Sequence, residues 1–370
     1  APGLGGDAMR AYAAAGITTD HESLTFEEAR EKLKAGIKLQ VRYGSAARRF
    51  EPFLPLLPRF PELCMFCSDD KHPDDLLRDH INFIAATAFR QGLALQTILQ
   101  AACVNPVRHY RLPLGLLQPG DSADFQIVDD LRTFRPREVW LRGRCVARDG
   151  VSLLPAGEPR VENNFAARPV TAEALRVPTR PGHRVRVIGV RDGELITAHL
   201  FETPSVSQGA VVADPERDLA KLVVCNRYAP ATPAVGFVKG FGLRRGAFAT
   251  SVAHDSHHVI AIGASDDALA AAINEVVYHR GGLAVADSNR KILTSLPLPL
   301  AGLISTEPAE RVAKAYSDCD RLAKILGSSL SAPFMTLSFL ALSVIPSLKL
   351  TDKGLFDGEA FRCVPLFEEA

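Results

Sequence analysis

The chain has 370 residues, more than one compact domain usually holds, so we expect two or three domains. Its 43 basic and 42 acidic residues give a net charge of +1, and 47% of its residues are hydrophobic. This composition is typical of a globular protein. It argues against nucleic-acid binding, because no excess of positive charge is present to meet phosphates.

No segment has the properties of a membrane anchor. The longest apolar stretch, from Phe334 to Ile345, is too short to cross a bilayer, and the first residues lack the basic and apolar parts of a signal peptide. The seven cysteines have no framework spacing, and Cys64 and Cys67 lack the second pair that a zinc ribbon needs. We therefore expect a reduced, cytoplasmic protein without a membrane partner.

Strands alternate with helices over the first 107 residues. The pattern predicts strands at 18–21, 38–43 and 63–68, and helices at 7–15, 25–35, 76–91 and 94–104. Alternation at this spacing favours a parallel α/β sheet. Three strands are fewer than the eight of a closed (β/α)8 barrel, so we expect at most part of such a barrel.

The pattern of predicted elements changes after this region. Short strands and glycine turns predict a small β domain, and the polar, proline-rich stretch 157–180 is typical of a linker. Beyond the linker, strands at 184–190, 219–225 and 246–252 and helices at 268–278 and 308–326 predict a separate α+β domain. We therefore expect domains at 1–107, 108–160 and 161–370.

Two strands of the first domain end in potential metal ligands. The first strand ends on His21, and the third is followed directly by Asp69 and Asp70. Chemistry in α/β barrels takes place at the carboxyl ends of the strands, so this placement predicts His21 and one aspartate as ligands. Neighbouring strand residues face opposite sides, and we favour Asp69. The plainer alternatives are a histidine paired with Glu22 and an aspartate that caps the following helix.

Further polar residues are candidates for substrate binding. Arg42 and Ser45 follow the second strand, although Arg42 could equally pair with Glu22 or Asp20. His254, Asp255 and His257 belong to the densest ionisable cluster of the chain. That cluster is open to three interpretations, namely a second metal site, an ordinary strand or turn with satisfied histidines, or a loop over the barrel mouth of its own or a neighbouring subunit, where it would contact substrate.

The sequence resembles the adenine deaminase family of the amidohydrolase superfamily. In the first half, the similarity lies in Asp20-His21-Glu22, Arg42-Tyr43-Gly44-Ser45, Cys67-Ser68-Asp69-Asp70 and the turn at 120–124. Beyond it, more specific similarities lie in 254–257, Gly281-Gly282, 296–305 and 334–340. The resemblance implies the C-terminal part of a (β/α)8 barrel, a small β-sandwich and the family's C-terminal α+β domain.

The resemblance also implies an activity, the hydrolytic deamination of adenine to hypoxanthine and ammonia by a hydroxide generated at a divalent metal. It implies that His21 and Asp69 bind the metal. The carboxylate of Asp69 or Asp70 would take the proton from the water and relay it to the leaving nitrogen. The implied metal is manganese, with iron or zinc as alternatives, and the implied partners are adenine and further copies of the chain.

One departure from the family pattern bears on activity. No His-x-His motif occurs, and the family's bridging carboxylate and next histidine have no counterpart, which predicts a chain lacking the N-terminal half of the barrel. The alternatives are then a non-catalytic remnant or a subunit that needs a partner chain for the missing strands. Another amidohydrolase, such as a cyclic-amide hydrolase, is the remaining alternative.

Overall fold

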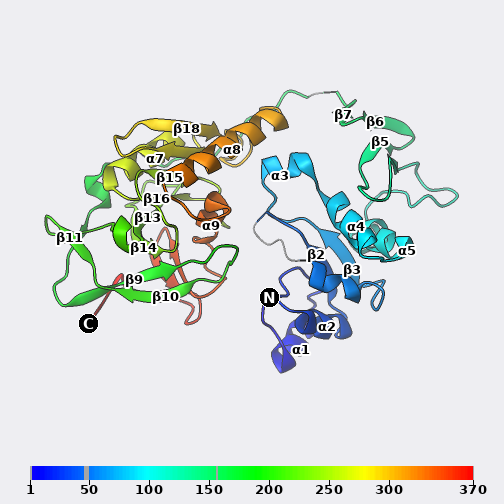
Figure 1. The fold of residues 1–370 in the computed structure, drawn as a ribbon, viewed down its shortest axis with the longest axis horizontal. Helices are drawn as coiled ribbons and strands as arrows, with labels where there is room; N and C mark the ends of the chain where they lie inside the picture. Colours follow the sequence, from blue (N-terminus) through cyan, green and yellow to red (C-terminus); the bar gives the residue numbers. More distant parts are fainter. Residues whose placement is uncertain (1, 46–49, 156, 370) are drawn as a thin grey trace. The chain divides into compact units, whose positions relative to one another are not determined.

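Figure 1 shows the computed structural model, which describes residues 2–45, 50–155 and 157–369. The chain divides into two compact units, Ala1–Glu158 and Pro159–Ala370. The division falls at the start of the proline-rich stretch. Over the described ranges, no helix has both the length and the apolar character needed to cross a membrane.

The first unit is built on a three-stranded parallel sheet. Its strands, in spatial order, are β1 (Thr19–Asp20), β2 (Lys38–Arg42) and β3 (Cys64–Cys67). The sequence predicted all three, with bounds that differ by one or two residues. Parallel pairing brings the carboxyl ends of the strands to one edge of the sheet. No closed barrel forms among the residues that the structure describes.

Helices surround this sheet. They are α1 (Gly6–Ala14), α2 (Phe26–Lys34), α3 (Pro73–Arg78), α4 (Ile81–Arg90), α5 (Leu95–Leu99) and α6 (Asn105–Tyr110), with a 3-10 helix at Glu51–Leu56 and a π-helical turn at Gln100–Val104. Thr25 caps α2, because its side chain accepts a hydrogen bond from the Glu28 amide. Leu33 of α2, Leu54 and Ile84 of α4 are fully buried in one core with strands β2 and β3.

One long predicted helix is instead two. The expected helix at 76–91 is interrupted between α3 and α4, where Asp79 has an extended backbone and accepts a 2.6 Å hydrogen bond from Lys71. The expected helix at 94–104 consists of α5 and the π-helical turn, and continues into α6.

The rest of the first unit contains an antiparallel meander, which confirms the predicted short strands. It consists of β4 (Phe125–Val128), β5 (Pro136–Leu141), β6 (Arg144–Arg148) and β7 (Val151–Ser152). Asp124 fixes the entry to the meander, because its carboxylate accepts hydrogen bonds from the amides of Gly115 and Arg142 at 2.9 and 2.7 Å.

The second unit contains a nine-stranded sheet. Its path runs β10 (Ala198–Glu202), β9 (His183–Gly189), β14 (Ala234–Lys239), β13 (Leu219–Cys225), β16 (Val259–Gly263), β15 (Ala247–Thr250), β17 (Gly282–Ala286) and β18 (Ile292–Pro297), with β22 (Phe367–Glu369) beside β9. Two three-stranded sheets accompany it. They are formed by β8 (Val177–Pro178), β11 (Ser205–Ser207) and β12 (Ala210–Val212), and by β19 (Leu348–Thr351), β20 (Gly354–Asp357) and β21 (Arg362–Cys363).

Helices cover both faces of the large sheet. Helix α7 (Asp266–Tyr278) shares a core with one set of alternating strand residues, such as Ala249 and Ala261. Helices α8 (Ala309–Ile325) and α9 (Pro333–Phe339) share a second core with the intervening residues, such as Phe248 and Ile262. Successive residues of each strand face opposite sides of the sheet, so helices pack on both faces. The unit therefore has three layers, which is a mixed α/β arrangement.

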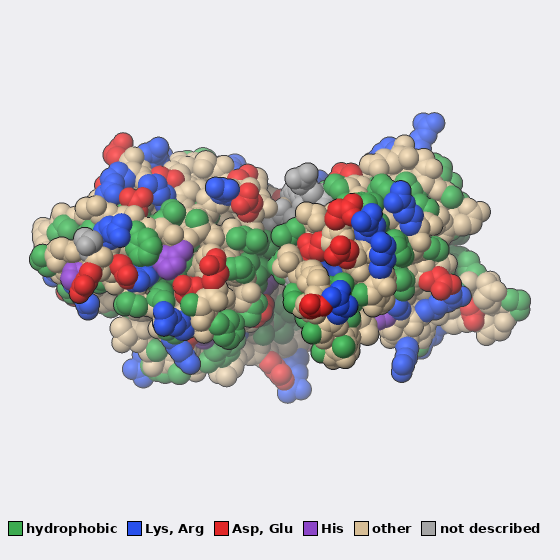
Figure 2. Space-filling model, turned by 90° about the horizontal axis from the view of Figure 1, so that it is seen from below, with side chains coloured by type: hydrophobic (Ala, Val, Ile, Leu, Met, Phe, Trp, Pro, Cys, Tyr) green, Lys and Arg blue, Asp and Glu red, His purple; other side chains and the backbone are tan. Residues whose placement is uncertain are grey.

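The surface agrees with the balanced composition. On the face shown in Figure 2, acidic and basic side chains lie interspersed among the described residues, without a large area of one sign. Such a face offers no extended basic footprint for a nucleic-acid backbone.

Candidate metal centre

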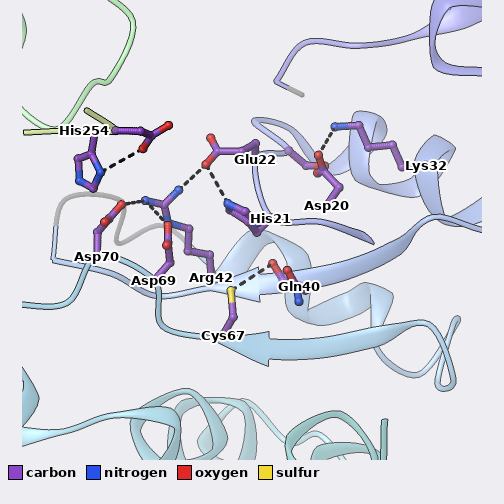
Figure 3. A network of polar contacts seen from close by, with 12 residues as sticks. Asp20, His21, Glu22, Lys32, Gln40, Arg42, Cys67, Asp69, Asp70 and His254 are labelled. Atoms are coloured by element: carbon purple, nitrogen blue, oxygen red, sulfur yellow. Dashed lines mark hydrogen bonds and ion pairs between the residues drawn. The ribbon is translucent and has the colours of Figure 1, made fainter. Parts of the chain in front are cut away.

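Three potential metal ligands meet at the carboxyl edge of the first unit's sheet (Figure 3). His21 and Glu22 follow β1 directly, and Asp69 lies just beyond β3. One ligand atom from each side chain lies within 4.8 Å of the other two. Over the described part of the chain, no other group of three such residues is found. The predicted pair of His21 and Asp69 is therefore brought together, with Glu22 as an additional member.

A buried ion pair fixes the residue before the histidine. The Asp20 carboxylate lies 3.0 Å from Nζ of Lys32 and accepts a 2.7 Å hydrogen bond from the Ser23 hydroxyl. Lys32 also contacts Glu28 at 2.7 Å, and its side chain is 2% exposed. These contacts hold the end of β1 against α2. Since adjacent residues of an extended chain point in opposite directions, His21 is presented on the other side.

Asp69 and Asp70 occupy a strained turn after β3. Their φ angles are +48° and +27°, a region that residues with a side chain rarely adopt. The end of β2 holds this turn, because the Ser45 amide donates to the Asp70 carbonyl at 3.2 Å. Gly44 also lies close to it, where a Cβ atom would be 2.9 Å from the Asp69 carbonyl oxygen. Strain that is held by its surroundings in this way is common at functional sites.

Arg42 lies between the acidic residues of the site (Figure 3). Its Nη1 is 2.6 Å from Oε1 of Glu22, and its Nη2 is 2.8 Å from Asp69 and 3.0 Å from Asp70. The Arg42 side chain is only 7% exposed. The sequence left the acidic partner of Arg42 open. The structure shows its contact with Glu22 and adds contacts with Asp69 and Asp70. The role of Arg42 as a substrate contact stays a prediction.

Ser45 links the end of β2 to the start of α3. Its hydroxyl donates to Asp75 at 2.6 Å and accepts a 2.8 Å hydrogen bond from the amide of His72. The Ser45 residue is 3% exposed. These contacts fix the segment that carries the two aspartates, and contact of Ser45 with a substrate stays a prediction.

The protonation behaviour of the three residues is coupled through their contacts. The hydrogen bond with Glu22, at 3.3 Å, raises the pKa of His21 more than burial lowers it. Burial raises the pKa of Glu22, but His21 and the Arg42 charge together bring that pKa below its ordinary value. Burial is also the main cause that raises the pKa of Asp69, with the Arg42 charge opposing it and the Asp70 charge adding to it.

This donor set suits a divalent ion. Imidazole nitrogen and carboxylate oxygen are ligands that Mn²⁺, Fe²⁺ and Zn²⁺ accept, and these atoms are close enough to share one ion. Cys67 lies near the site (Figure 3), and burial raises the pKa of its thiol to about 12, which favours the protonated thiol when no ion is bound.

The histidine cluster lies in the second unit. His254 stacks on Phe339 with ring centroids 4.4 Å apart, its Nδ1 lies 3.6 Å from Asp255, and its ring centroid is 5.9 Å from that of His257. Since the single three-residue group found in the described ranges is the one at His21, the second metal site that the sequence suggested is not found here. Substrate contact by His254, Asp255 and His257 stays a prediction.

His258, the last residue of that cluster, is an ordinary satisfied histidine. Its Nδ1 accepts a 3.2 Å hydrogen bond from the Arg227 amide, and its Nε2 lies 3.5 Å from Asp352. Burial lowers its pKa, so the neutral ring is favoured. For this residue the plainer interpretation holds.

Glu22 is the one member of the site that sequence reasoning missed. The sequence alone indicates Glu22 only as a hydrogen-bond partner of His21. The available signal was its position directly after the strand end, where a carboxylate next to a ligand histidine can reach the same ion. Only the fold shows that Glu22 lies beside Asp69 as well.

Comparisons with known proteins find family models and relatives that match both units of the chain. A model of the amidohydrolase family matches residues 6–146, and a model of the adenine deaminase C-terminal domain matches residues 194–362. An adenine deaminase of Salinibacter ruber is 50% identical over 99% of this chain and 67% of its own length. Adenine deaminases of Methanosarcina barkeri and Syntrophobacter fumaroxidans are 43% and 46% identical, over 68% and 65% of their lengths.

The chain thus spans about two thirds of the length of these relatives. The similarity is not confined to one unit, because the alignment with the Salinibacter ruber protein extends over 369 residues. The chain therefore belongs to the adenine deaminase family.

Proposed function

We propose that this chain serves the metal-dependent hydrolytic deamination of adenine to hypoxanthine and ammonia. The observation that carries the proposal is the meeting of His21, Glu22 and Asp69 at a carboxyl edge of parallel strands in a member of the adenine deaminase family. Metal dependence follows from membership of the amidohydrolases. A cyclic-amide hydrolase is disfavoured, because the second unit matches the domain named for adenine deaminases.

The finer architecture is part of the proposal. Residues 1–107 would be the last strands of a (β/α)8 barrel, 108–160 part of a small β-sandwich, and 161–370 the C-terminal α+β domain. Two observations support this division, namely the three parallel strands β1 to β3 and the separate meander β4 to β7.

The metal would be held by His21, Glu22 and Asp69, with manganese as the proposed ion and iron or zinc as alternatives. When bound, a divalent ion supplies Lewis acidity that lowers the pKa of water towards neutrality. The family implies this requirement, and the donor atoms present are of the right kind and spacing for it.

The Asp69 carboxylate would be the proton carrier. It would accept a proton as the water oxygen bonds to C6 of adenine, and donate it to the exocyclic nitrogen as the C6–N bond breaks, so that nitrogen leaves as ammonia. The position of Asp69 beside His21 and Glu22 supports this role. Asp70, the alternative carboxylate, would share its contact with Arg42.

Adenine itself would be oriented by the predicted substrate contacts. These are Arg42, Ser45, His254, Asp255 and His257. Arg42 and Ser45 lie beside the turn that carries Asp69, which supports their inclusion. For the three residues of the second unit, the support is the sequence resemblance alone.

The test is adenine-dependent ammonia release by the purified chain with added Mn²⁺ or Fe²⁺, together with its metal content by elemental analysis. Hypoxanthine formation with bound metal, lost in His21→Ala and kept in the control variant His183→Ala, is the expected result. Bound metal without turnover would favour the non-catalytic alternative, or a subunit that needs a partner chain. Absence of both metal and turnover would refute the proposal.

Two accompanying expectations concern the protein as a whole. We propose a cytoplasmic protein that forms a homo-oligomer or binds a chain supplying further barrel strands. Light scattering on the purified chain at several concentrations measures its molar mass and so tests for the homo-oligomer.

A further inference from the structure

The Arg42 guanidinium contacts acids of the site with both of its terminal nitrogens. Nη1 contacts Glu22, and Nη2 contacts both Asp69 and Asp70, all at 3.0 Å or less. Two of these three acids are the proposed carboxylate ligands. The arginine therefore lies against the same oxygen-bearing groups that a divalent ion would use.

Arg42 brings a positive charge among three acids. The carboxylates of Glu22, Asp69 and Asp70 each carry a negative charge when ionised, and the guanidinium of Arg42 contacts all three. Without the arginine, three like charges would lie together at a partly buried position, which is unfavourable because water screens them poorly there.

We propose that Arg42 holds the three carboxylates together by charge when no metal is bound, and that its own positive charge weakens the binding of a divalent cation. The inference rests on the proposed function. Arg42 acts in two ways. It stabilises the protein when no metal is bound, because it neutralises acids that otherwise repel one another. It also places a positive charge beside the ion, and this charge repels any metal ion bound there.

The location of Arg42 makes this role specific. It ends β2, the central strand of the three, so its side chain can reach both the residue after β1 and the turn after β3. In the described structure its Nε is buried without a hydrogen-bond partner, so the polar contacts of the guanidinium are those with the acids. A neutral side chain of similar length could fill the same space, but it would not supply the positive charge.

The experiment compares the full chain with its Arg42→Met variant, each depleted of metal with a chelator and then titrated with Mn²⁺. We expect the melting temperature of the metal-depleted variant to fall by about 5 °C or more, as for loss of one partner of a buried ion pair. We expect its Kd for Mn²⁺ to fall by at least about tenfold, because a positive charge has been removed from beside the ion. Arg42→Lys, which keeps the charge on a single nitrogen, should lie between the two.

Arg186→Met is the matched control. Arg186 is also a buried arginine that contacts a carboxylate, that of Glu368, and backbone carbonyls of Pro365 and Phe367, all within the second unit. Its loss should lower the melting temperature and leave the Kd for Mn²⁺ unchanged.

The outcomes separate this inference from the function on which it rests. Mn²⁺ binding by the wild-type chain with an equal or weaker affinity in Arg42→Met would overturn the inference alone. Unchanged Mn²⁺ affinity would also overturn it, and a raised KM for adenine in the same variant would leave Arg42 with the role of a substrate contact alone. Absence of Mn²⁺ binding in both proteins would overturn the metal site itself.

Discussion

Gly44 passes so close to Asp69 that a Cβ atom on the glycine would lie 2.9 Å from the aspartate's carbonyl oxygen. The end of one strand and the turn after its neighbour are thus packed backbone against backbone. This contact leaves no room for a side chain at position 44, and it holds a turn whose backbone is already strained.

The first prediction concerns this contact. Gly44→Ala should displace the Asp69 turn, lower the free energy of unfolding by about 1–3 kcal/mol and weaken metal binding, since overpacking forces the backbone to shift. Chemical denaturation and Mn²⁺ titration measure the two effects. Gly157→Ala is the control, because a Cβ there meets nothing within 4 Å. Equal behaviour of the two variants would argue against a tight turn.

A second prediction separates the two aspartates. Asp69, but not Asp70, belongs to the group of three potential ligands. Asp69→Asn should therefore abolish metal binding and lower kcat/KM by about 10² or more, as for loss of a general base. Asp70→Asn should retain the metal and lose less activity. The metal content and the deamination rate of both variants test this prediction. A greater loss of metal and activity in Asp70→Asn than in Asp69→Asn would assign the catalytic role to Asp70.

A third prediction addresses Ser45. Its hydroxyl bridges Asp75 and the His72 amide, so Ser45→Ala should cost about 1–3 kcal/mol of stability by leaving buried groups without that partner. Thermal unfolding and steady-state kinetics on one preparation measure the stability and the KM for adenine. A raised KM at unchanged stability would show instead that the hydroxyl acts on the substrate.

A fourth prediction concerns Lys349 in the second unit. Its Nζ donates to the Leu195 carbonyl at 2.9 Å, and burial lowers its pKa from 10.5 to about 7. Between those two values the unfolded chain binds the proton and the folded chain does not, so this residue makes stability rise with pH, by at most about 1.4 kcal/mol per pH unit. Below pH 7 both states are protonated, and the cost of burying the charge persists in full.

Denaturation curves at several pH values between 7 and 10 test this prediction. Lys349→Met should remove that part of the slope and be more stable than the wild-type chain at pH 7. Lys353→Met, which alters an exposed lysine nearby in sequence, should leave the slope unchanged. The prediction fails if the slope is the same in all three proteins.

Much of the fold was predictable because buried apolar residues recur in the sequence with the period of a helix or a strand. Strand β13 has the predicted bounds, since six of the seven residues from Leu219 to Cys225 are apolar and all seven are buried. The break between α3 and α4 was not predictable. It depends on an extended Asp79 held by Lys71, a contact that no local pattern records.

The same distinction applies to the site. The placement of His21 and Asp69 at strand ends indicated that they could meet, because parallel strands share an edge. The third potential ligand, Glu22, and the contacts of Arg42 depend on side-chain directions across three strands. Those directions follow from the register of β1, β2 and β3, which the sequence alone does not specify.

The layered second unit has one more consequence. Its large sheet presents small residues to α7, among them Ala249 and Ala284, and large ones such as Phe248 and Leu283 to α8 and α9. The two faces should therefore tolerate opposite kinds of change. Added methyl groups on the alanine face would push α7 away, whereas shortened side chains on the other face would leave cavities. Neighbouring residues of one strand thus have opposite size limits, set by the helix that each one faces.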